Sequence, residues 1–586
     1  MSAKQAVIIG AGPAGLTAAY ELSKLNTPVV VLEQQPFVGG LASTQTYKGF
    51  SFDLGGHRFF TKVPEVKKIW HEVLGGDFLR RPRLSRIYYD GKFFRYPLQP
   101  LDALRGLGIW NSVLVALSYG WWQLFPYREE RTFEQWVTNR FGRRLFRTFF
   151  QAYTEKVWGI PCSELKAEWA AQRIKDLSLK TVLINMFVKP RTTVKSLIEE
   201  FHYPRLGPGM MWRAVRDEIE RWGGSVRLDS EVRRITRNGT HIENVVIAAD
   251  DDDEIIRGTD FISSMPVTEF IKRLDPPAPP DVLAAAHRLK YRDFLTVVLI
   301  VDRADIFRDN WIYVHDPEVR VGRIQNFKNW SPDMVPSQDQ TALGLEYFCD
   351  EGDELWTSAD ENLIERGKRE VVRLGFARYE EITDGCVVRV SKAYPVYDAD
   401  YRDHLQTVRT FVDRFENFQT IGRNGLHRYN NQDHAMVTGL LAARNVMFGE
   451  RNDVWSVNTD EEYHEVVRQE TITDALVPVF AKLDRVALGA SIGAAGAIVM
   501  FLTTFWVMLG GTATAAVPKL ALIGQFFPGY TVTWTGGVIG GAYGLVIGFL
   551  AGWMFALARN IIVFGYMAAM HHRAERHALR RVLDYF

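Results

Sequence analysis

The chain has 586 residues, of which 47% are apolar and 13% aromatic, and its formal net charge is +1. This composition allows more than one domain with a large buried core, and the balanced charge argues against a nucleic-acid partner. Cys162, Cys349 and Cys386 follow no metal-binding spacing, so we expect no metal centre and a reducing compartment.

Residues 6–33 predict a β–α–β unit that binds a dinucleotide. A short apolar run is followed by GxGxxG, a helical pattern from Leu16 to about Leu25, a second apolar run and an acid. The glycines allow a tight turn and close approach of a pyrophosphate, and the helix N-terminus attracts phosphate. A strand–helix turn without ligand can show the same spacing, but here the flanking strands and the acid are also present. The candidate contacts are Gly10, Gly12, Pro13, Ala14, Gly15 and Glu33, the last of which would bind a ribose diol.

The residues after Glu33 indicate which dinucleotide is bound. A glycine pair follows at positions 39–40, and the run FDLGGHRFF covers residues 52–60. An acid followed by a second glycine pair resembles the FAD signature of the glutathione-reductase and amine-oxidase superfamily, whereas NAD-linked dehydrogenases usually lack it. We therefore predict FAD, with further contacts from Gly39, Gly40, Leu41, Ala42, Gly55, Gly56 and His57.

The next hundred residues predict a hairpin and several helices. Residues 87–98 read as a β-hairpin around Asp90–Gly91. The stretch 106–126 is uncharged and contains three tryptophans, which fits a helix at a membrane interface and equally a helix of a soluble lid. Helical patterns continue from Thr132 to about Leu177.

The middle of the chain predicts a return to the FAD domain and then a second sheet. An amphipathic helix and short strands follow residue 205, and the acidic run 250–254 reads as a solvated hairpin tip. Strands from residue 291 onward indicate an antiparallel substrate-domain sheet. Residues 420–446 read as strand, loop and helix, in which Asp433 would cap a helix that begins near His434. The contacts expected from this closing segment are Gly422, Arg423, Asp433 and Met436.

Two long uncharged stretches near the C-terminus predict a membrane hairpin. Residues 486–509 and 531–557 contain 24 and 27 residues without a charge, and about 20 helical residues span a bilayer. Basic residues gather outside the pair, at 482, 485, 559, 573, 576, 580 and 581, whereas the intervening loop holds only Lys519. This asymmetry, with the absence of a signal-peptide pattern, predicts an inner or plasma membrane protein whose flavin domain and both termini are cytoplasmic. Two buried helices of a soluble protein are the alternative.

Small residues repeat every fourth position in both stretches. They are Gly536, Gly540, Gly544, Gly548 and Gly552 in the second, and Gly489, Gly493 and Ala497 in the first. Such residues let helix backbones approach closely in lipid. They would either close the hairpin on itself or join copies of the chain into a homo-oligomer, and the sequence does not separate these two uses.

The fold class predicted is therefore α/β. We expect a Rossmann-like FAD-binding domain of glutathione-reductase type, a mixed α+β substrate domain and a C-terminal two-helix transmembrane hairpin. The expected ranges are 1–100, 206–275 and 401–470 for the FAD-binding domain, 101–205 for a helical lid, 276–400 for the substrate sheet and 484–586 for the hairpin with a basic tail.

Three motifs together resemble the UDP-galactopyranose mutases, within the FAD-dependent amine-oxidase-like fold. GGHRFFT (55–61) is similar to that family's Gly-Pro-His run, and YTEKVWG (153–159) is similar to its substrate-loop segment. AYPVYDADY (393–401) and IGRNGLHRYNNQD (421–433) look like its tyrosine-bearing and closing segments. The resemblance covers residues 5–450 and leaves the hairpin outside it.

The resemblance implies a reaction in which reduced flavin acts as a nucleophile. Flavin N5 would attack the anomeric carbon of a phosphate-linked sugar, and the resulting N5–sugar adduct would open and reclose with the other ring size. The leaving phosphate requires Arg and Tyr donors. The residues implied by matching positions are His57, Trp158, Arg423, Tyr394, Tyr397 and Tyr429. Further candidates are Arg58, Tyr401, Arg173 and Arg323.

The chain differs from the soluble mutases in one motif and carries an additional C-terminal segment. They carry a second histidine where this chain has Phe59 and Phe60, and this chain adds a hairpin. We therefore expect a sugar carried on polyprenyl phosphate, with a nucleotide sugar as the other substrate left open, in an enzyme of cell-envelope polysaccharide synthesis. The alternatives are an FAD-dependent oxidoreductase on a lipophilic substrate, such as a desaturase, a protoporphyrinogen-type oxidase or an amine oxidase, and a flavin-bearing membrane scaffold without catalysis.

Overall fold

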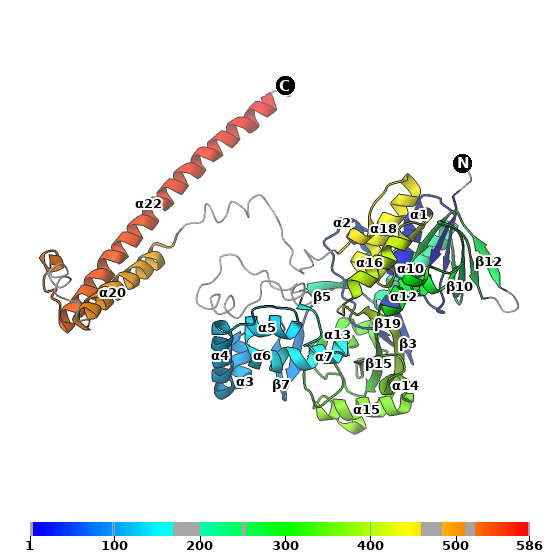
Figure 1. Ribbon diagram of the computed structural model, residues 1–586, viewed down its shortest axis with the longest axis horizontal. Helices are drawn as coiled ribbons and strands as arrows, with labels where there is room; N and C mark the ends of the chain where they lie inside the picture. The colour runs from blue at the N-terminus through cyan, green and yellow to red at the C-terminus, as the bar shows by residue number, and fades with distance from the viewer. Residues whose placement is uncertain are drawn as a thin grey trace. The chain divides into compact units, whose positions relative to one another are not determined.

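The computed structural model describes residues 4–167 except 97 and 99, 200–248, 253–458 except 399, 483–509 and 522–583. The chain forms two compact units, Met1–Val467 and Arg468–Phe586. Figure 1 shows the sheets and most of the helices in the first unit and two long helices in the second.

A parallel sheet of five strands forms the centre of the FAD-binding domain. Its order is β20 (Phe418–Thr420), β13 (Asp260–Ser263), β1 (Ala6–Ile9), β2 (Val29–Leu32) and β9 (Ser225–Arg227). The middle strand β1 is fully buried and pairs in parallel with β2 and β13, which explains why its residues are all apolar. The predicted β–α–β unit is present, with α1 (Pro13–Lys24) between β1 and β2.

Three helices from distant parts of the chain surround α1 and its sheet. They are α2 (Pro64–Leu74), α10 (Pro208–Arg221) and α18 (Gln432–Phe448). Their buried apolar faces join one core cluster with the side chains of α1 and the central strands. The last predicted segment therefore returns to the first one, as the sequence indicated.

A smaller four-stranded sheet lies on the FAD-binding domain. Its order is β12 (Glu254–Arg257), β11 (His241–Ile247), β10 (Val232–Asn238) and β14 (Leu274–Asp275). Helices α11 (Val267–Lys272), α12 (Pro280–Arg288) and α16 (Tyr401–Val412) pack with it in a second core cluster. The acidic run predicted as a hairpin tip falls at the β11–β12 connection, and residues 249–252 lie outside the described part.

The substrate domain is built on a seven-stranded sheet. Its order is β19 (Ile382–Pro395), β15 (Tyr291–Val301), β18 (Thr341–Cys349), β17 (Arg323–Asn326), β16 (Trp311–Val314), β6 (Ser85–Tyr89) and β7 (Lys92–Arg95). Helix α15 (Asp360–Arg373) packs on it, and Gly375 with a positive φ follows the end of that helix. The antiparallel sheet predicted from residue 291 is present.

The predicted range of the first FAD segment needs one correction. The hairpin of β6 and β7 forms as expected around Asp90–Gly91, but β6 pairs in parallel with β16 and so belongs to the substrate sheet. The neighbouring strands β3 (Thr44–Tyr47) and β4 (Phe50–Asp53) form a separate hairpin, and β5 (Phe78–Pro82) pairs with β8 (Glu200–Pro204). The range 1–100 therefore crosses between the two domains.

The helical region beyond residue 100 is broken by glycines. It contains α3 (Pro100–Leu107), α4 (Ile109–Leu124), α5 (Phe133–Phe141), α6 (Arg143–Phe146), a π-helical turn (Arg147–Gln151) and α7 (Ala152–Trp158). Thr132 forms a capping box with Gln135 at the start of α5. Gly142 and Gly159 take positive φ values that end α5 and α7, so the helical patterns predicted from Thr132 onward form several short helices, and residues 168–177 of that prediction lie outside the described part.

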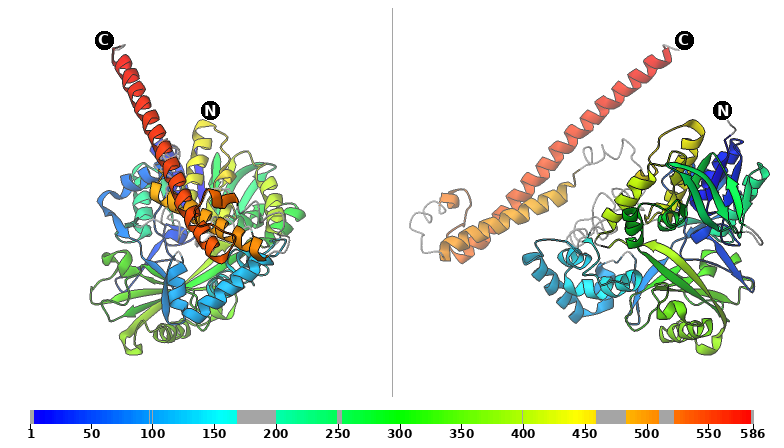
Figure 2. Two further views of the ribbon diagram at one scale, coloured as in Figure 1. Left: turned by 90° about the vertical axis from the view of Figure 1, so that its left-hand side faces the viewer. Right: turned by 45° about the vertical axis from the view of Figure 1, so that its right-hand side comes forward.

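The second unit contains α20 (Arg485–Leu509) and α22 (Trp534–Leu583), which lie side by side (Figures 1 and 2). By length and composition, α20 and residues 534–562 of α22 could each cross a membrane. A Cβ added at Gly493, Gly544 or Gly548 would lie 2.5–2.7 Å from a carbonyl oxygen of the facing helix. These glycines are thus used within the hairpin, and association of several copies through them stays a prediction.

Candidate functional site

The turn between β1 and α1 has an open side on which a ligand can lie. The amide of Gly10 donates to Leu32 O at 2.8 Å, and Gly10 has a φ of +100°. A Cβ at Gly15 would meet Gly10 O at 2.0 Å, whereas a Cβ at Gly12 would have no atom within 4 Å. Gly12 is the N-cap residue of α1, and no side chain caps this helix. The amides that follow Pro13 in the first turn of α1 therefore have no capping side chain and can bind an anion.

Glu33 is held against this turn. Its Oε2 accepts a hydrogen bond from Ala11 N at 2.7 Å, and its Oε1 accepts one from Gln35 N at 3.0 Å. Burial raises the pKa of the Glu33 carboxyl, while these backbone donors oppose the shift. The acid predicted to bind a ribose thus lies beside the glycine-rich turn.

Two other predicted segments reach the same turn. Gly39 donates to Ala11 O at 2.8 Å, and a Cβ at Gly40 would lie 3.3 Å from the Cα of Gly12. From the closing segment, a Cβ at Gly422 would lie 3.1 Å from the Cβ of Ala14. The structure therefore brings glycines from all three predicted FAD segments to the same turn.

Asp433 is not the helix cap that the sequence predicted. Helix α18 begins at Gln432, and Asn431 caps it in a capping box with His434. Asp433 lies in the first turn with only 4% of its surface exposed, and its Oδ1 has no hydrogen-bond partner among the described residues. Such a buried oxygen fits a polar cofactor group. The side chain of Met436 lies instead in the core, where its sulfur accepts a hydrogen bond from Trp70 Nε1.

A second group of predicted site residues lies near the segment that follows β4 and consists of His57, Arg323 and Arg423. The Nε2 of His57 donates to Leu54 O at 2.8 Å, and a Cβ at Gly55 would lie 3.7 Å from that Nε2 and 3.9 Å from Arg323 Nη2. Burial lowers the pKa of His57 to about 4, and the positive charges of Arg423 and Arg323 act in the same direction. His57 is therefore neutral at neutral pH.

Arg423 lies against two stacked tyrosines. The rings of Tyr394 and Tyr429 are 5.6 Å apart, and Arg423 Cζ lies 4.7 Å from the ring centre of Tyr429 and 5.7 Å from that of Tyr394. Arg423 Nε donates to Asn430 O at 2.8 Å. Burial, with Tyr429 next, raises the pKa of the Tyr394 hydroxyl, so Tyr394 stays protonated as a donor.

The predicted Arg323 forms a buried ion pair that the sequence analysis missed. Arg323 Nε donates to Glu346 Oε2 at 2.9 Å, and Gln325 Nε2 donates to the other carboxylate oxygen. Glu346 is fully buried, and the pKa of Arg323 is raised well above its usual value despite burial because this carboxylate lies beside it. An acid within the apolar strand TALGLEYFC was the available signal.

The other predicted residues are divided among three places. Tyr397 accepts a hydrogen bond from Tyr429 N at 2.6 Å and packs on Tyr401, which starts α16. Trp158 is buried in the same core cluster as Tyr394. Arg173 lies outside the described residues.

Arg58 lies with a second arginine that sequence reasoning did not identify. The guanidinium carbons of Arg58 and Arg83 lie 5.7 and 5.6 Å from the ring centre of Trp311. Burial and the charge of Arg58 lower the pKa of Arg83 to about 10. Within the described residues, no group of three or more His, Cys, Asp or Glu side chains could hold a metal ion.

Comparisons with known proteins agree with this geometry. Residues 13–447 match the flavin-containing amine oxidoreductase family. A 49-residue stretch is 53% identical to the inactive all-trans-retinol 13,14-reductase of Danio rerio and covers 8% of each chain. The matches span from 8 to 61% of the length of the curated relatives, which is less than two thirds in every case.

Solved structures share the fold at low sequence identity. A reduced UDP-galactopyranose mutase superposes with a TM-score of 0.67 at 21% identity, covering 78% of this chain and 98% of the mutase. A putrescine oxidase bound to putrescine superposes with a TM-score of 0.51 at 16% identity, covering 76% of this chain and 99% of the oxidase. The predicted α/β fold and the resemblance to this superfamily are confirmed. Because the family match covers most of the chain, the protein belongs to the flavin-containing amine oxidoreductase family and binds FAD.

Proposed function

We propose that this flavoenzyme is a membrane-anchored mutase that interconverts the pyranose and furanose forms of a phosphate-linked sugar. The observation that carries the proposal is the group of Arg423, neutral His57 and the stacked tyrosines Tyr394 and Tyr429. Among the described residues no carboxylate pairs with Arg423, so its positive charge is available to an anion. The similarity in fold to a reduced UDP-galactopyranose mutase supports the same reaction class.

The side chains of this group suit departure of a phosphate. When bound, reduced FAD would supply the nucleophile for the anomeric carbon. Arg423 would stabilise the charge that develops on the leaving phosphate, and the protonated hydroxyl of Tyr394 would donate a hydrogen bond to it. His57 lies near both arginines and would act as a neutral hydrogen-bonding group.

The substrate carrier that we propose is polyprenyl phosphate. Helices α20 and α22 are long and apolar enough to hold the chain at a bilayer. With both ends of this hairpin in the cytoplasm, the flavin domain would work at the inner leaflet of the plasma membrane, where a lipid-linked sugar presents its phosphate.

The second candidate function is an FAD-dependent oxidoreductase acting on a lipophilic substrate. The fold shared with putrescine oxidase favours it, as does the family to which the chain belongs. The two functions differ in electron balance. An oxidase transfers electrons to an acceptor in every turnover, whereas a mutase returns its flavin to the same redox state.

The consumption of an electron acceptor in each catalytic cycle distinguishes the oxidoreductase from the mutase. We expect the purified chain, reduced once with dithionite under argon, to convert a polyprenyl-phosphate galactopyranose into its furanose isomer over many turnovers without further reductant. Product would be quantified by NMR of the released sugar, with flavin absorbance followed in parallel. Stoichiometric oxygen or quinone consumption with an oxidised product would instead establish the oxidoreductase.

Removing the hydroxyl of Tyr394 tests its role as a donor. We expect Tyr394→Phe to lower kcat about tenfold to hundredfold, which is the range for a lost hydrogen bond to a charged group. FAD content and melting temperature should stay at the wild-type values. Tyr379→Phe is the matched control, because the Tyr379 hydroxyl bonds Glu365 at the surface. Equal rates for the two variants would remove Tyr394 from the reaction.

Glu33 is expected to bind the FAD ribose. Glu33→Gln keeps an acceptor for Ala11 N but loses the negative charge, and it should weaken FAD binding about tenfold or more because a charged hydrogen bond is lost. The retained FAD would be measured by absorbance after dialysis over a dilution series. Glu72→Gln, at an exposed ion pair with Lys24, is the control and should retain wild-type affinity. Equal FAD retention in the two variants would contradict the role of Glu33.

The lowered pKa of His57 predicts an acid-dependent loss of stability. The unfolded chain binds a proton at this position near pH 6.5, whereas the folded chain binds it near pH 4. Stability from neutral His57 is therefore fully present above pH 6.5 and is lost as pH falls from 6.5 to 4. Urea unfolding of the detergent-solubilised chain, followed by tryptophan fluorescence, should show wild type losing more stability over this interval than His57→Gln. Parallel pH profiles would contradict the assignment.

A further inference from the structure

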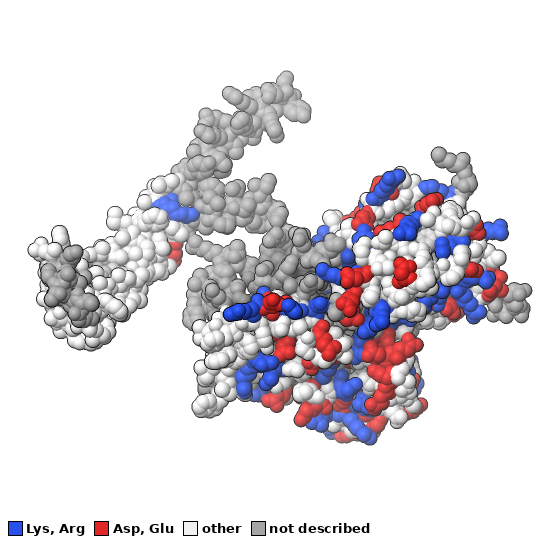
Figure 3. All heavy atoms as spheres, in the orientation of Figure 1, with Lys and Arg blue, Asp and Glu red and all other residues white. Residues whose placement is uncertain are grey.

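Helix α4 leaves one face of large apolar side chains exposed. Trp110, Leu117, Trp121 and Leu124 are exposed over 82, 65, 60 and 75% of their surfaces, and their spacing places them on one side of the helix. The helix has no charged residue. Figure 3 shows uncharged surface in the region of α4, with basic side chains nearby. Val115 is buried and joins α4 to the core, so the exposed face belongs to a packed helix.

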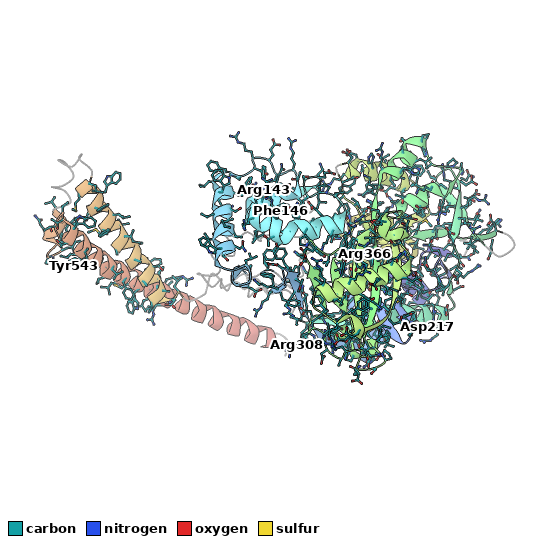
Figure 4. All side chains as sticks on the ribbon, turned by 90° about the horizontal axis from the view of Figure 1, so that it is seen from below. Arg143, Phe146, Asp217, Arg308, Arg366 and Tyr543 are labelled. Atoms are coloured by element: carbon teal, nitrogen blue, oxygen red, sulfur yellow. The ribbon has the colours of Figure 1, made fainter. Side chains whose placement is uncertain are left out.

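A basic pocket lies beside this face. It has a volume of about 580 Å³ and is lined by α4 on one side and by Arg143, Arg144 and Arg147 on the other. Figure 4 labels Arg143 and Phe146 in the helical region that holds α4. Lys92 adds a fourth positive charge, and Asp90 is the acidic residue of the lining. The described lining thus carries an excess of positive charge directly next to exposed apolar surface.

The three arginines of the pocket differ in their ion pairs and hydrogen bonds within the protein. Arg143 pairs with Glu134 at 2.9 Å, and Arg144 Nη2 donates to Asn111 Oδ1 at 2.8 Å. Arg147 is exposed and has no ion-pair or hydrogen-bond partner for its side chain among the described residues. Arg144 and Arg147 therefore have donors available for a phosphate.

We propose that α4 docks in the headgroup region of an anionic bilayer and that Arg144 and Arg147 bind a phospholipid phosphate in the adjacent pocket. Tryptophans near both ends of the helix suit the interface between headgroups and acyl chains. The basic pocket matches the phosphate charge at the same depth. This contact is separate from the hairpin, and it goes beyond the proposed reaction because it applies equally to a mutase and an oxidoreductase.

The chain itself favours a bilayer over a protein partner at this face. Only 24 residues, 459–482, separate the first unit's last described residue from the residues that lead into α20. With the hairpin in a membrane, a stretch of this number of residues sets an upper limit on the distance between the first unit and that membrane, since fully extended chain covers about 3.3–3.6 Å per residue.

Depth-sensitive fluorescence of the full chain in nanodiscs tests the docking. We would attach an environment-sensitive fluorophore at Leu117→Cys and quench it with doxyl-labelled phosphatidylcholine in discs that contain phosphatidylglycerol. Ile255→Cys is the control position, because Ile255 is 55% exposed on β12. Background labelling would be measured on wild type, in which Cys162 and Cys349 are buried and Cys386 is partly exposed. We expect about twofold or greater quenching at position 117 relative to position 255. Equal quenching would overturn the docking of α4.

The phosphate contact is tested in the same discs by charge removal. Arg144→Gln with Arg147→Gln should lower the docking equilibrium about fivefold for each arginine, and only when phosphatidylglycerol is present. Arg369→Gln with Arg373→Gln removes the same charge from α15 and should leave quenching unchanged. If the double variant loses FAD or melts early, Arg147→Gln alone serves. Quenching that is independent of both phosphatidylglycerol and the arginines would overturn the phosphate site.

Discussion

The close packing of α1 on its flanking segments is the constraint on which the FAD-binding domain depends. Gly15 lets α1 lie against Gly10 O, and Gly439 lets α18 lie against Ala14 O, where added Cβ atoms would come within 2.0 and 2.3 Å. Because the backbones pack this closely, the axis of α1 has a fixed direction. The amides at the start of α1 are thereby aimed at one place, and segments more than 400 residues apart meet there.

The fixed position of α1 also determines where Arg423 lies in relation to the substrate domain. Gly422 lies against Ala14 of α1, and the next residue, Arg423, reaches Tyr394 on β19 of the substrate domain. The charges of the buried Arg323 and Glu346 compensate each other, and separating the two side chains would leave one buried charge without a partner. Of the two arginines near neutral His57, Arg423 is the one without a carboxylate partner among the described residues. The turn predicted to bind FAD and the group proposed to bind a phosphate are thus contacted by consecutive residues, Gly422 and Arg423.

Local patterns predicted those parts of the fold whose causes are local. The glycine spacing, the apolar runs and the uncharged stretches identified β1, α1, α20 and the strands from Tyr291 onward, because each depends on its own residues. Pairing across the chain was not predictable in this way. The hairpin of β6 and β7 was recognised, but its attachment to β16 depends on a strand more than 200 residues away. Glu346 was missed for the same reason, since its partner Arg323 lies on a neighbouring strand.

The apolar surface of the α20–α22 hairpin and that of α4 differ in composition and in the interaction that this composition favours. In α20 and α22 the facing residues are glycines, and the backbones approach until carbonyl oxygens lie where side chains would stand. Close packing of this kind stabilises helices in lipid, where burial of apolar area contributes little. On α4 the exposed residues are large and include tryptophans, which suits transfer of side chains out of water. The small residues of α20 and α22 suit close contact between helices, whereas the large exposed residues of α4 suit contact with an apolar surface, and the chain separates these two compositions between its units.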